Sequence, residues 1–474
     1  MRVRPARRVL TVLAGAICLF AGFSGIASAG PSSTVKGSPQ PELAPFVIAG
    51  TGDSGAAVAL GPNKTFVVLY EVHAHYVVCV LARGARSCKS KVNLTPENGS
   101  DIFGSPEVFV VGSDVDVVMD ECCYADYLLF QSTNGGKSFG AGENIGTNDD
   151  LQGIGSAVVA NGNVVWVDGT DAIVDSAPLS DPGAAEQTSS SVVPNGSGNN
   201  ELENSGIGTY KGGVLVAAST FANVPSTRVY YAPEGSDPGS LSSYGPVGTF
   251  SNARFEFLEG NALITQKVNG TTPFEIRMFN GTSFGAEHEV PYSNGGGPQW
   301  FGAAVSSSGR VFFFSSRHQD SYDLYIESTT NGSHWTTRRN YGNAVTSYSF
   351  NGALDSIGSG IVVGAGDPVR AYPVMVSQSV SFHLSRSSVV EGTRVTATGK
   401  SSHPKAGRTV KLERLIAGLW HNIASTSESA SGKFTFHITE HTAASYTFRA
   451  RASDETGYVQ YGYSPAKVLK VSKP

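Results

Sequence analysis

Ser132-Thr133-Asn134-Gly135-Gly136-Lys137-Ser138-Phe139 follows an apolar run from Tyr127 to Phe130. Asn and Gly accept a positive backbone φ, and Ser and Asn side chains hydrogen-bond their own backbone, so the stretch predicts a tight turn between two antiparallel strands. We expect Phe139 to fold back over this turn as the return strand begins. The hairpin decides the fold class, because similar turns recur along the chain.

Two further stretches share this turn chemistry. One is Ser328-Thr329-Thr330-Asn331-Gly332-Ser333-His334-Trp335, and the more degenerate one is Asn280-Gly281-Thr282-Ser283-Phe284-Gly285-Ala286. They resemble the Asp-box, or BNR, repeat of sialidase-like β-propellers, whose pattern is Ser-x-Asp-x-Gly-x-x-Trp. In that family the box stabilises a turn remote from the active centre, so the resemblance implies a fold and no chemistry. On that pattern the structural positions are Ser132, Asn134, Gly136 and Phe139 in the first copy and Ser328, Thr330, Gly332 and Trp335 in the second.

Short apolar strands divided by glycine turns recur at a regular spacing of about 50 residues, the size of a four-stranded propeller blade. The first unit reads as strands over 54–60, 65–71, 76–81 and 88–94, and the last as 354–357, 360–364 and 371–377. Residues 44–49 supply a fourth strand to the last unit, which closes the ring and leaves no exposed sheet edge. We expect seven blades, with six as the alternative because sialidases have six. The units begin near Asp53, Phe103, Gly153, Ser205, Ser251, Trp300 and Asn351.

The N-terminus has the features of a secretory signal peptide. A basic start precedes an apolar run over 9–23 and then Ala27-Ser28-Ala29, so we expect cleavage after Ala29. The alternative, an uncleaved membrane anchor, is disfavoured because the apolar run is short for a membrane span. Residues 1–29 are thus predicted to be a signal peptide and 30–43 a linker. The exported chain is expected to be extracellular and monomeric, without membrane insertion.

The sequence changes character near Val380. Polar and apolar residues then alternate over several segments, which predicts strands with one face in a core and one in water. The region resembles the Ig-like modules appended to bacterial secreted proteins, and it has no cysteine pair of the antibody type. The chain is therefore predicted to be all-β, with a β-propeller over 44–378 and an Ig-like β-sandwich over 379–474.

Composition supports this fold class and limits the partners. The chain has 56 glycines and 23 prolines, which favours strands and turns over helices. Its formal net charge is -5, and it has no basic cluster outside the signal peptide, so we expect no binding of nucleic acid.

Four cysteines remain after the signal peptide, and export favours disulfides. Cys79 and Cys88 flank a predicted hairpin turn and could join its two strands. Cys122 and Cys123 are adjacent, so they either pair with each other or each pair with one of the first two. Structural disulfides are favoured over metal binding, because no Cys-x-x-Cys pattern occurs.

The sialidase-like enzymes carry an arginine triad, a Tyr nucleophile paired with a Glu, an Asp acid, and an Arg in a Phe-Arg-Ile-Pro-like motif near the N-terminus. The corresponding region of this chain reads Pro45-Phe46-Val47-Ile48-Ala49-Gly50, without arginine. Between the signal peptide and Arg228 the only arginines are Arg83 and Arg86, both in a predicted turn. This departure disfavours sialidase activity.

Polar residues remain at the propeller mouth, where the loops leading into the innermost strands converge. We expect a secreted, non-catalytic protein that binds a glycan or another extracellular surface ligand at this mouth. The alternative is a glycoside hydrolase that uses carboxylates at the rim. Oxygen ligands there could also hold Ca²⁺, although no metal ligand set is assigned. The candidate ligand-binding residues are Asp53, Glu201, Glu203, Trp300 and Asp355, and the catalytic candidates are Asp149, Asp150, Arg254 and Glu256.

Overall fold

The computed structural model describes residues 44–50, 56–61, 65–72, 75–94, 102–121, 126–147, 154–168, 174–184, 202–220, 226–238, 240–267, 273–291, 300–306, 308–316, 323–336, 339–343, 347–376, 378–452 and 462–474. These segments are almost entirely strand and turn, with two short 3-10 turns, η2 (Pro182–Ala184) and η3 (Leu241–Ser243). Within them no helix is long and apolar enough to cross a membrane. The predicted signal peptide and linker lie outside the described residues.

The described residues between 46 and 374 form seven antiparallel sheets in sequence order. Sheet by sheet, their strands are β2 (Ala56–Gly61), β3 (Thr65–Val72), β4 (His75–Ala82) and β5 (Cys88–Leu94); β6 (Ile102–Val111), β7 (Asp114–Glu121), β8 (Asp126–Ser132) and β9 (Glu143–Thr147); β10 (Ile154–Ala160), β11 (Asn163–Asp168) and β12 (Val174–Pro178); β13 (Leu202–Tyr210), β14 (Gly213–Thr220), β15 (Ser226–Ala232) and β16 (Gly245–Ser251); β17 (Ala253–Glu259), β18 (Ala262–Lys267), β19 (Glu275–Met278) and β20 (His288–Glu289); β21 (Trp300–Val305), β22 (Val311–Ser316), β23 (Asp323–Thr329) and β24 (Arg339–Asn343); and β25 (Ser347–Leu354), β26 (Gly360–Gly366), β27 (Val369–Val374) and β1 (Phe46–Ala49).

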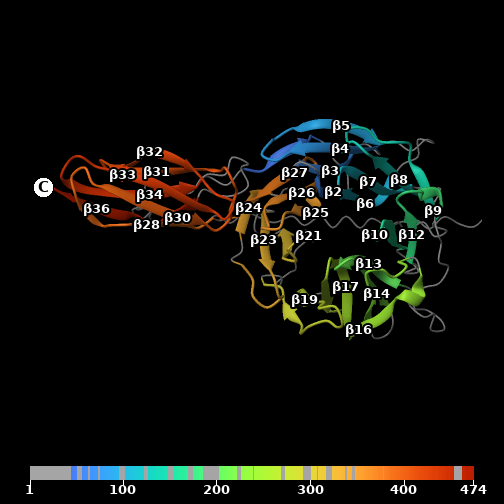
Figure 1. Cartoon of the computed structure of the whole chain (residues 1–474). Coiled ribbons are helices and arrows are strands. Elements are labelled where there is room, and N and C mark those ends of the chain that lie inside the picture. The colour runs from blue at the N-terminus through green and yellow to red at the C-terminus, as the bar shows by residue number, and fades with distance from the viewer. Residues whose placement is uncertain are drawn as a thin grey trace, which may run out of the picture. The chain divides into compact units, whose positions relative to one another are not determined.

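The seven sheets close into a β-propeller ring. The first strand of each sheet contacts the first strand of the next, in the cycle β2, β6, β10, β13, β17, β21, β25 and back to β2. A separate buried apolar cluster fills the space between each pair of neighbouring sheets. Because the sheets are covered on both faces, second strands such as β22 and β26 are buried along their whole length. Figure 1 shows the sheets following one another around the ring in chain order.

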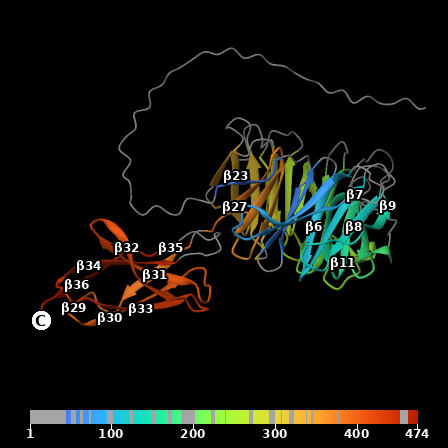
Figure 2. The ribbon, with the colours of Figure 1, turned by 90° about the horizontal axis from the view of Figure 1, so that it is seen from above.

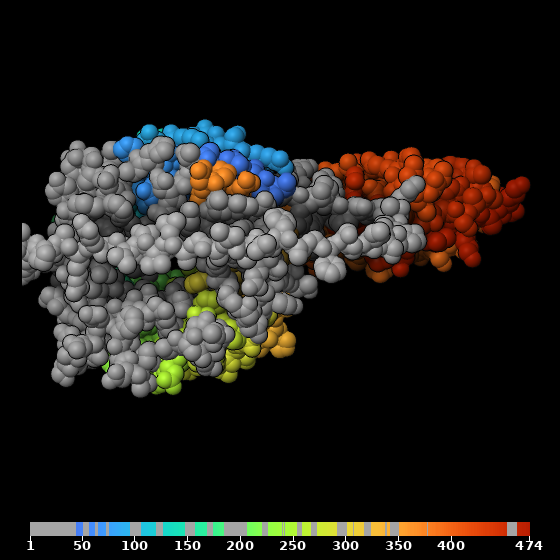
Figure 3. Space-filling view, turned by 180° about the vertical axis from the view of Figure 1, so that it is seen from behind, coloured from blue at the N-terminus to red at the C-terminus, as the bar shows by residue number. Residues whose placement is uncertain are grey.

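The two ends of the propeller sequence pair within one sheet. β1 runs antiparallel to β27, with Phe46 opposite Ala371, so the predicted closure by residues 44–49 is confirmed. Blue atoms of the first strands lie against orange atoms of the last sheet in the space-filling view (Figure 3). An ion pair also joins these sheets, since Arg83 Nη2 lies 2.7 Å from Asp355 Oδ2. Closure therefore rests on both backbone pairing and side-chain contact.

The strand prediction is accurate in the first sheet and partly wrong in the last. All four strands of the first sheet occur within two residues of their expected bounds. In the last sheet the expected strand over 354–357 is wrong, because its residues after Leu354 form a turn that Asp355 caps. The first strand of that sheet lies upstream, at Ser347–Leu354.

The turn after β8 has the predicted hairpin chemistry. Ser132 Oγ accepts a hydrogen bond from Gly136 N at 2.9 Å. Asn134 Oδ1 accepts bonds from Lys137 N and Ser138 N at 3.0 and 3.1 Å. Gly135 and Gly136 both have positive φ, of 75° and 77°, and Phe139 packs on the cluster between the first two sheets. These contacts stabilise the turn locally.

The second box uses residues one position later than expected. Gly332 N donates to Thr329 Oγ1 at 2.9 Å, and Asn331 Oδ1 accepts from Ser333 N and His334 N at 3.1 and 3.0 Å. The assignment of Ser328 and Thr330 to these roles is therefore corrected. The reason is that this turn is one residue shorter before its aromatic residue, and Thr329 supplies the hydroxyl that Ser132 supplies in the first turn.

The third, degenerate stretch has the same capping. Asn280 Oδ1 accepts hydrogen bonds from Thr282 N and Ser283 N at 3.0 and 3.1 Å. In all three turns an asparagine caps the two amides directly before an aromatic residue. These residues, Phe139, Phe284 and Trp335, each pack on a cluster between sheets. The asparagine and the aromatic residue are thus the shared elements of the repeat.

A disulfide joins Cys79 and Cys88 across the turn between β4 and β5, with a Cα–Cα distance of 5.4 Å. This confirms one of the pairings that the sequence allowed and excludes those in which Cys79 or Cys88 bonds to Cys122 or Cys123. The last two cysteines lie outside the described residues.

The C-terminal region is a sandwich of two sheets around a single apolar core (Figure 2). Its charged residues include a buried ion pair, in which Arg408 Nε donates to Glu428 Oε2 at 2.7 Å. Its strands are β28 (Val380–Leu384), β30 (Arg394–Ser401) and β33 (Lys433–Thr439) in one sheet, and β29 (Ser388–Val390), β36 (Lys467–Ser472), β34 (Ala444–Ala452), β31 (Thr409–Ile416), β32 (Leu419–Ser427) and β35 (Gly462–Tyr463) in the other.

Candidate functional site

A cavity of about 650 Å³ lies in the channel at the centre of the propeller ring. Residues from the first strands of all seven sheets line it, together with the turns that follow β13, β17 and β21. The strands approach closely at glycines. A Cβ at Gly208 would collide with the carbonyl oxygen of Gly260, and one at Gly352 would collide with the Phe314 ring. Glycines on the innermost strands therefore allow neighbouring sheets to pack closely around the channel.

Two glutamates line this cavity from different sheets. Glu107 belongs to β6 and Glu259 ends β17, and both side chains are half-buried. Burial raises the pKa of Glu107 to about 8, with a further contribution from the charge of Glu259. Burial also raises the pKa of Glu259 to about 7, and a hydrogen bond with the Val305 backbone opposes this shift. Near neutral pH the two carboxyl groups therefore retain protons that exposed glutamates would have lost.

Irregular strand pairing precedes both glutamates. The register of β6 against β7 shifts between Phe103 and Glu107, and that of β17 against β18 shifts between Phe255 and Phe257. A β-bulge changes which face the following side chains occupy. In β17 the shifted register skips Glu256, and Glu259 follows beyond the bulge. In β17 the one-residue irregularity thus changes the face that Glu259 occupies.

Other polar side chains that line the cavity already have partners within the protein. Asn261 Nδ2 donates to Phe279 O at 3.0 Å, and Ser306 Oγ contacts Ser308 Oγ at 3.0 Å within its own turn. Lys211 also lines the cavity, but its Nζ lies 5.1 Å from the Tyr210 ring centroid. Burial raises the pKa of Tyr231, and the charge of Lys211 opposes this shift. The Lys211 ammonium group is therefore engaged with an aromatic pair of the fourth sheet.

An apolar vestibule adjoins the cavity at the end of the channel where the first strands turn into the second strands. It has a volume of about 490 Å³ and shares several wall residues with the deeper cavity. Val111 at this end is 49% exposed. A ligand that enters through the vestibule would pass apolar walls before it meets the two carboxyl groups. The vestibule is lined by residues that include Leu60, Val110, Val111, Val159 and Leu354.

Metal ligands do not cluster around the glutamate pair. Among the residues that the structure describes, no group of three or more His, Cys, Asp or Glu side chains could hold a metal ion. Hydrogen bonding through carboxyl, amide and hydroxyl groups is the chemistry that the described cavity offers.

Most of the residues predicted for the mouth lie beyond the described part of the chain or have only their backbone described. Asp53, Asp149, Asp150 and Glu201 belong to the first group. Glu203 in β13, Arg254 and Glu256 in β17, and Trp300 at the start of β21 belong to the second. These four lie toward the beginnings of first strands, whereas the described cavity lies toward their ends. The structure therefore does not bring the predicted residues together with the glutamate pair.

Asp355 lies at the opposite end of its sheet from the predicted mouth, so its placement there is corrected. Its Oδ1 accepts hydrogen bonds from Ile357 N and Ser359 N at 3.1 and 2.9 Å. Its Oδ2 accepts from Ser359 Oγ and Arg83 Nη2, both at 2.7 Å. Because Asp355 follows β25 rather than preceding it, its carboxylate caps a turn and joins two sheets.

Sequence reasoning missed Glu107 and Glu259. Glu259 is followed by Gly260-Asn261, so it looks like an ordinary polar residue before a turn, and Glu107 follows Pro106 inside an apolar strand. The one available signal was a glutamate within the first strand of two of the repeating units.

Comparisons with known proteins give no family for this chain. No family profile matches it, and no curated protein matches it in sequence. A triple arginine-to-alanine mutant of AofleA from Arthrobotrys oligospora is 8% identical with a TM-score of 0.38, over 84% of this chain and 93% of that chain. The polysaccharide lyase Uly1 is 11% identical with a TM-score of 0.36, over 60% and 77%. The WD40 domain of SCAP from fission yeast is 9% identical with a TM-score of 0.34, over 90% and 96%. At these TM-scores we take neither ligand nor activity from the similarity.

Proposed function

We propose that this chain is an exported, non-catalytic binding protein that receives a neutral glycan in the central channel of its propeller. The observation that carries the proposal is the pair of glutamates with raised pKa values in one cavity, behind an apolar vestibule. The propeller is taken as seven-bladed and of the Asp-box type, and the C-terminal sandwich as an Ig-like accessory domain. The signal peptide expected over 1–29 and the disulfide support export.

Seven blades are supported by the sheet order and by the cores. Seven sheets contact one another in a closed cycle, and seven apolar clusters alternate with them. The Asp-box assignment is supported by the asparagine-capped turns that start at Ser132, Asn280 and Thr329.

The ligand class follows from the protonation of the cavity. A protonated carboxyl group donates one hydrogen bond and still accepts others, so Glu107 and Glu259 can match sugar hydroxyls, which also do both. Apolar wall residues such as Phe109 and Val158 can pack against the C–H faces of a sugar ring. A hydroxyl-rich ligand with no net charge therefore suits this cavity, because the two protonated carboxyl groups offer hydrogen bonds and carry no charge.

The test uses the mature chain from Gly30 on an array of neutral glycans, followed by titration of each hit at pH 6. Glu107→Leu and Glu259→Leu remove the hydrogen-bonding groups and keep a similar volume, so we expect at least tenfold weaker binding. Glu143→Leu is the matched control, because Glu143 is exposed on the outermost strand of the same sheet as Glu107. Unchanged affinity in both channel variants would refute the proposal.

A glycoside hydrolase is the second candidate, favoured by the fact that two carboxyl groups of raised pKa line one cavity. A coupled pair that shares one proton has one acid and one base, as hydrolysis requires. The first proposal is preferred because burial raises both pKa values, to about 8 and about 7, whereas catalytic carboxyl pairs have pKa values that are driven apart. The missing arginine near Phe46 also argues against a sialidase mechanism.

The two candidates predict different behaviour of the amide variants. Glu107→Gln and Glu259→Gln keep hydrogen-bonding groups but cannot transfer a proton. If the protein is a hydrolase, wild type turns over the glycans it binds, and the amide variants lose turnover while binding remains. If the protein only binds, no glycan that it captures is cleaved.

A further inference from the structure

Charge is divided unevenly along the chain. Residues 379–474 contain 13 Lys and Arg residues and six Asp and Glu residues, a formal net charge of +7, whereas that of the whole chain is -5. Three of the six carboxylates, those of Glu413, Glu428 and Glu440, form ion pairs within the sandwich. This region therefore has an excess of positive charge, although the chain as a whole is acidic.

The outer face of the smaller sheet of the sandwich, formed by β28, β30 and β33, exposes part of this charge. β30 and β33 lie side by side in this sheet (Figure 2). Alternate residues of the three strands are buried in the apolar core, and those between them point outward. The outward residues of these described strands are three cations, two histidines and otherwise Ser and Thr, and none is acidic. The cations, Arg394, Lys400 and Lys433, are all exposed.

Two of these cations form a like-charged pair. Lys400 of β30 and Lys433 of β33 are directly opposite each other in the register of the two strands. Side chains in this position have Cβ atoms about 5 Å apart, and like charges there destabilise a sheet. Within the described part of the chain, neither lysine side chain has an ion-pair or hydrogen-bond partner. An uncompensated pair of this kind favours a ligand of opposite charge.

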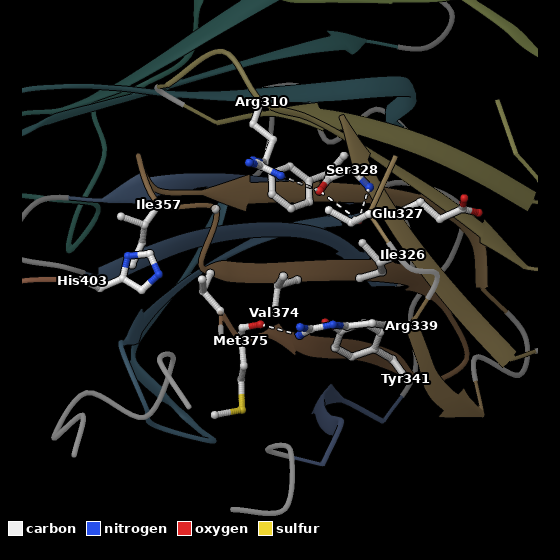
Figure 4. A pocket seen from close by; sticks show the side chains of 14 residues that line it. Arg310, Ile326, Glu327, Ser328, Arg339, Tyr341, Ile357, Val374, Met375 and His403 are labelled. Atoms are coloured by element: carbon white, nitrogen blue, oxygen red, sulfur yellow. Dashed lines mark hydrogen bonds between the residues drawn. The ribbon is translucent and has the colours of Figure 1, made fainter. Parts of the chain in front are cut away.

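Several other cations of the chain are held by partners. In the propeller, Arg339 Nη1 donates to the carbonyl oxygen of Met375 at 2.8 Å (Figure 4). On the larger sheet of the sandwich, Arg449 Nε donates to Glu413 Oε2 at 2.8 Å. Arg394, at the other end of β30 from Lys400, makes no such side-chain contact with any described residue. The positive charge on the outer face of the smaller sheet is therefore available to an external partner.

The residue types on this face suit an extended, hydroxyl-rich polymer. Arg394 and Lys400 are six residues apart along β30, which corresponds to about 20 Å. Several of the side chains between them are threonines, whose hydroxyls both donate and accept hydrogen bonds. Aromatic and large aliphatic residues of these described strands point into the core instead. The face thus lacks the stacking groups that bind single-stranded nucleic acid and the apolar anchors of protein interfaces.

We propose that the outer face of the smaller sheet binds an acidic polysaccharide, a polymer of sugar carboxylates that lies along β30. Arg394 contacts carboxylates at one end of the strand, and the Lys400–Lys433 pair contacts them at the other. The surface shares no residue with the central channel and does not depend on the channel proposal. Such binding gives the sandwich a role of its own, the attachment of the exported chain to an acidic extracellular polymer.

The experiment measures binding of the mature chain from Gly30 to immobilised polygalacturonate, with uncharged dextran as the comparison, at low and at high salt. We expect saturable binding to polygalacturonate and none to dextran. High salt should weaken the binding at least tenfold, because it screens exposed charges. The Lys400→Gln, Lys433→Gln double variant and Arg394→Gln should each weaken it at least fivefold at low salt.

The Lys89→Gln, Lys470→Gln double variant is the matched control, because it removes two positive charges from exposed residues of β5 and β36. We expect its affinity for polygalacturonate to stay within twofold of wild type. Lys433→Glu turns the like-charged pair into a pair of opposite charges, so it should raise the Tm while it weakens binding at least tenfold. Loss of binding through misfolding would lower the Tm instead.

Three results would overturn the inference: wild type does not bind polygalacturonate at low salt, the folded lysine double variant binds as wild type does, or single-stranded DNA binds more tightly than the polysaccharide. The last result would assign the face to nucleic acid. Failure of the channel proposal gives a different pattern. In that case neutral glycans fail to bind or are insensitive to the glutamate variants, while polygalacturonate binding still depends on Lys400 and Lys433.

Discussion

Glu107 and Glu259 line one cavity from the second and fifth sheets of the ring, and the charge of Glu259 raises the pKa of Glu107 beyond the effect of burial. A pair of carboxyl groups in such a position makes the folded state hold protons that the unfolded chain releases. The pair thus links the proposed binding site to the pH dependence of stability.

The stability of the propeller should fall as the pH rises from about 5 to 8. Both glutamates have folded-state pKa values above the ordinary 4.5, so both states are protonated below that value. Above it the unfolded chain loses its protons first, and the folded state keeps them until pH 7 to 8, so the free energy of unfolding decreases. The Glu107→Gln, Glu259→Gln double variant should flatten this fall and melt on the order of 2–4 °C above wild type at pH 8. The measurement is the Tm from pH 4 to 9.

Glu143→Gln is the control for this experiment and should follow the wild-type profile, because Glu143 is exposed. Asp116 also has a pKa raised by burial, so a residual slope should remain in the double variant. A double variant with the same pH profile as wild type would show that the glutamate pair is solvated.

Asn331 should stabilise its turn more than its neighbour Thr330 does. Replacing Asn331 with Ala leaves the amides of Ser333 and His334 without their acceptor and should cost about 1–2 kcal/mol. Thr330→Ala should change stability by less than about 0.5 kcal/mol, because Thr330 is exposed. Chemical denaturation measures both values. If Thr330→Ala cost more stability than Asn331→Ala, the assignment of Thr330 expected from the Asp-box pattern would be correct instead.

The disulfide should contribute measurably to the stability of the first sheet. Replacing Cys79 and Cys88 with Ala reopens the loop between β4 and β5 and should lower the free energy of unfolding by about 2–3 kcal/mol. Reducing agent should destabilise wild type and leave this double variant almost unaffected. Equal sensitivity to reductant in both proteins would assign the effect to cysteines outside the described residues.

The buried ion pair of the sandwich should be much more sensitive to charge removal than a partly exposed one. Glu428→Gln leaves Arg408 charged in a buried site and should cost about 3–5 kcal/mol. Glu440→Gln breaks the partly exposed contact with Arg414 and should cost about 1 kcal/mol or less. Chemical denaturation of the full chain measures both. Similar costs for the two variants would mean that water reaches the Arg408 guanidinium group.

Local patterns in the sequence were sufficient to predict most of the described propeller architecture. The Ser132 to Phe139 turn follows from residues that act on their immediate neighbours, and the ring closure by β1 follows from the fourth strand that the last unit lacks. The Cys79–Cys88 pairing was one of the alternatives that the sequence left open. The register of the second box could not be predicted, since Ser328 and Thr329 both carry a hydroxyl. Only the hydrogen bond from Gly332 N to Thr329 Oγ1 distinguishes them.

The candidate site could not be predicted in the same way, because it depends on the closed ring. Glu107 and Glu259 come from sheets that are not consecutive, and a one-residue bulge in β17 changes the side-chain alternation ahead of Glu259. Alternation read from the sequence assumes regular pairing, and one unpaired residue reverses the faces that follow it. Asp355 shows the related error, in which a strand boundary set too late moved a turn residue to the wrong end of its sheet.

The most direct test of the channel proposal is a binding titration at pH 6 between the mature chain and the neutral glycans that it captures on an array. The proposal predicts saturable binding that Glu107→Leu and Glu259→Leu each weaken at least tenfold, with Glu143→Leu equal to wild type. Absence of binding to every neutral glycan, or equal affinity in all three variants, would contradict it.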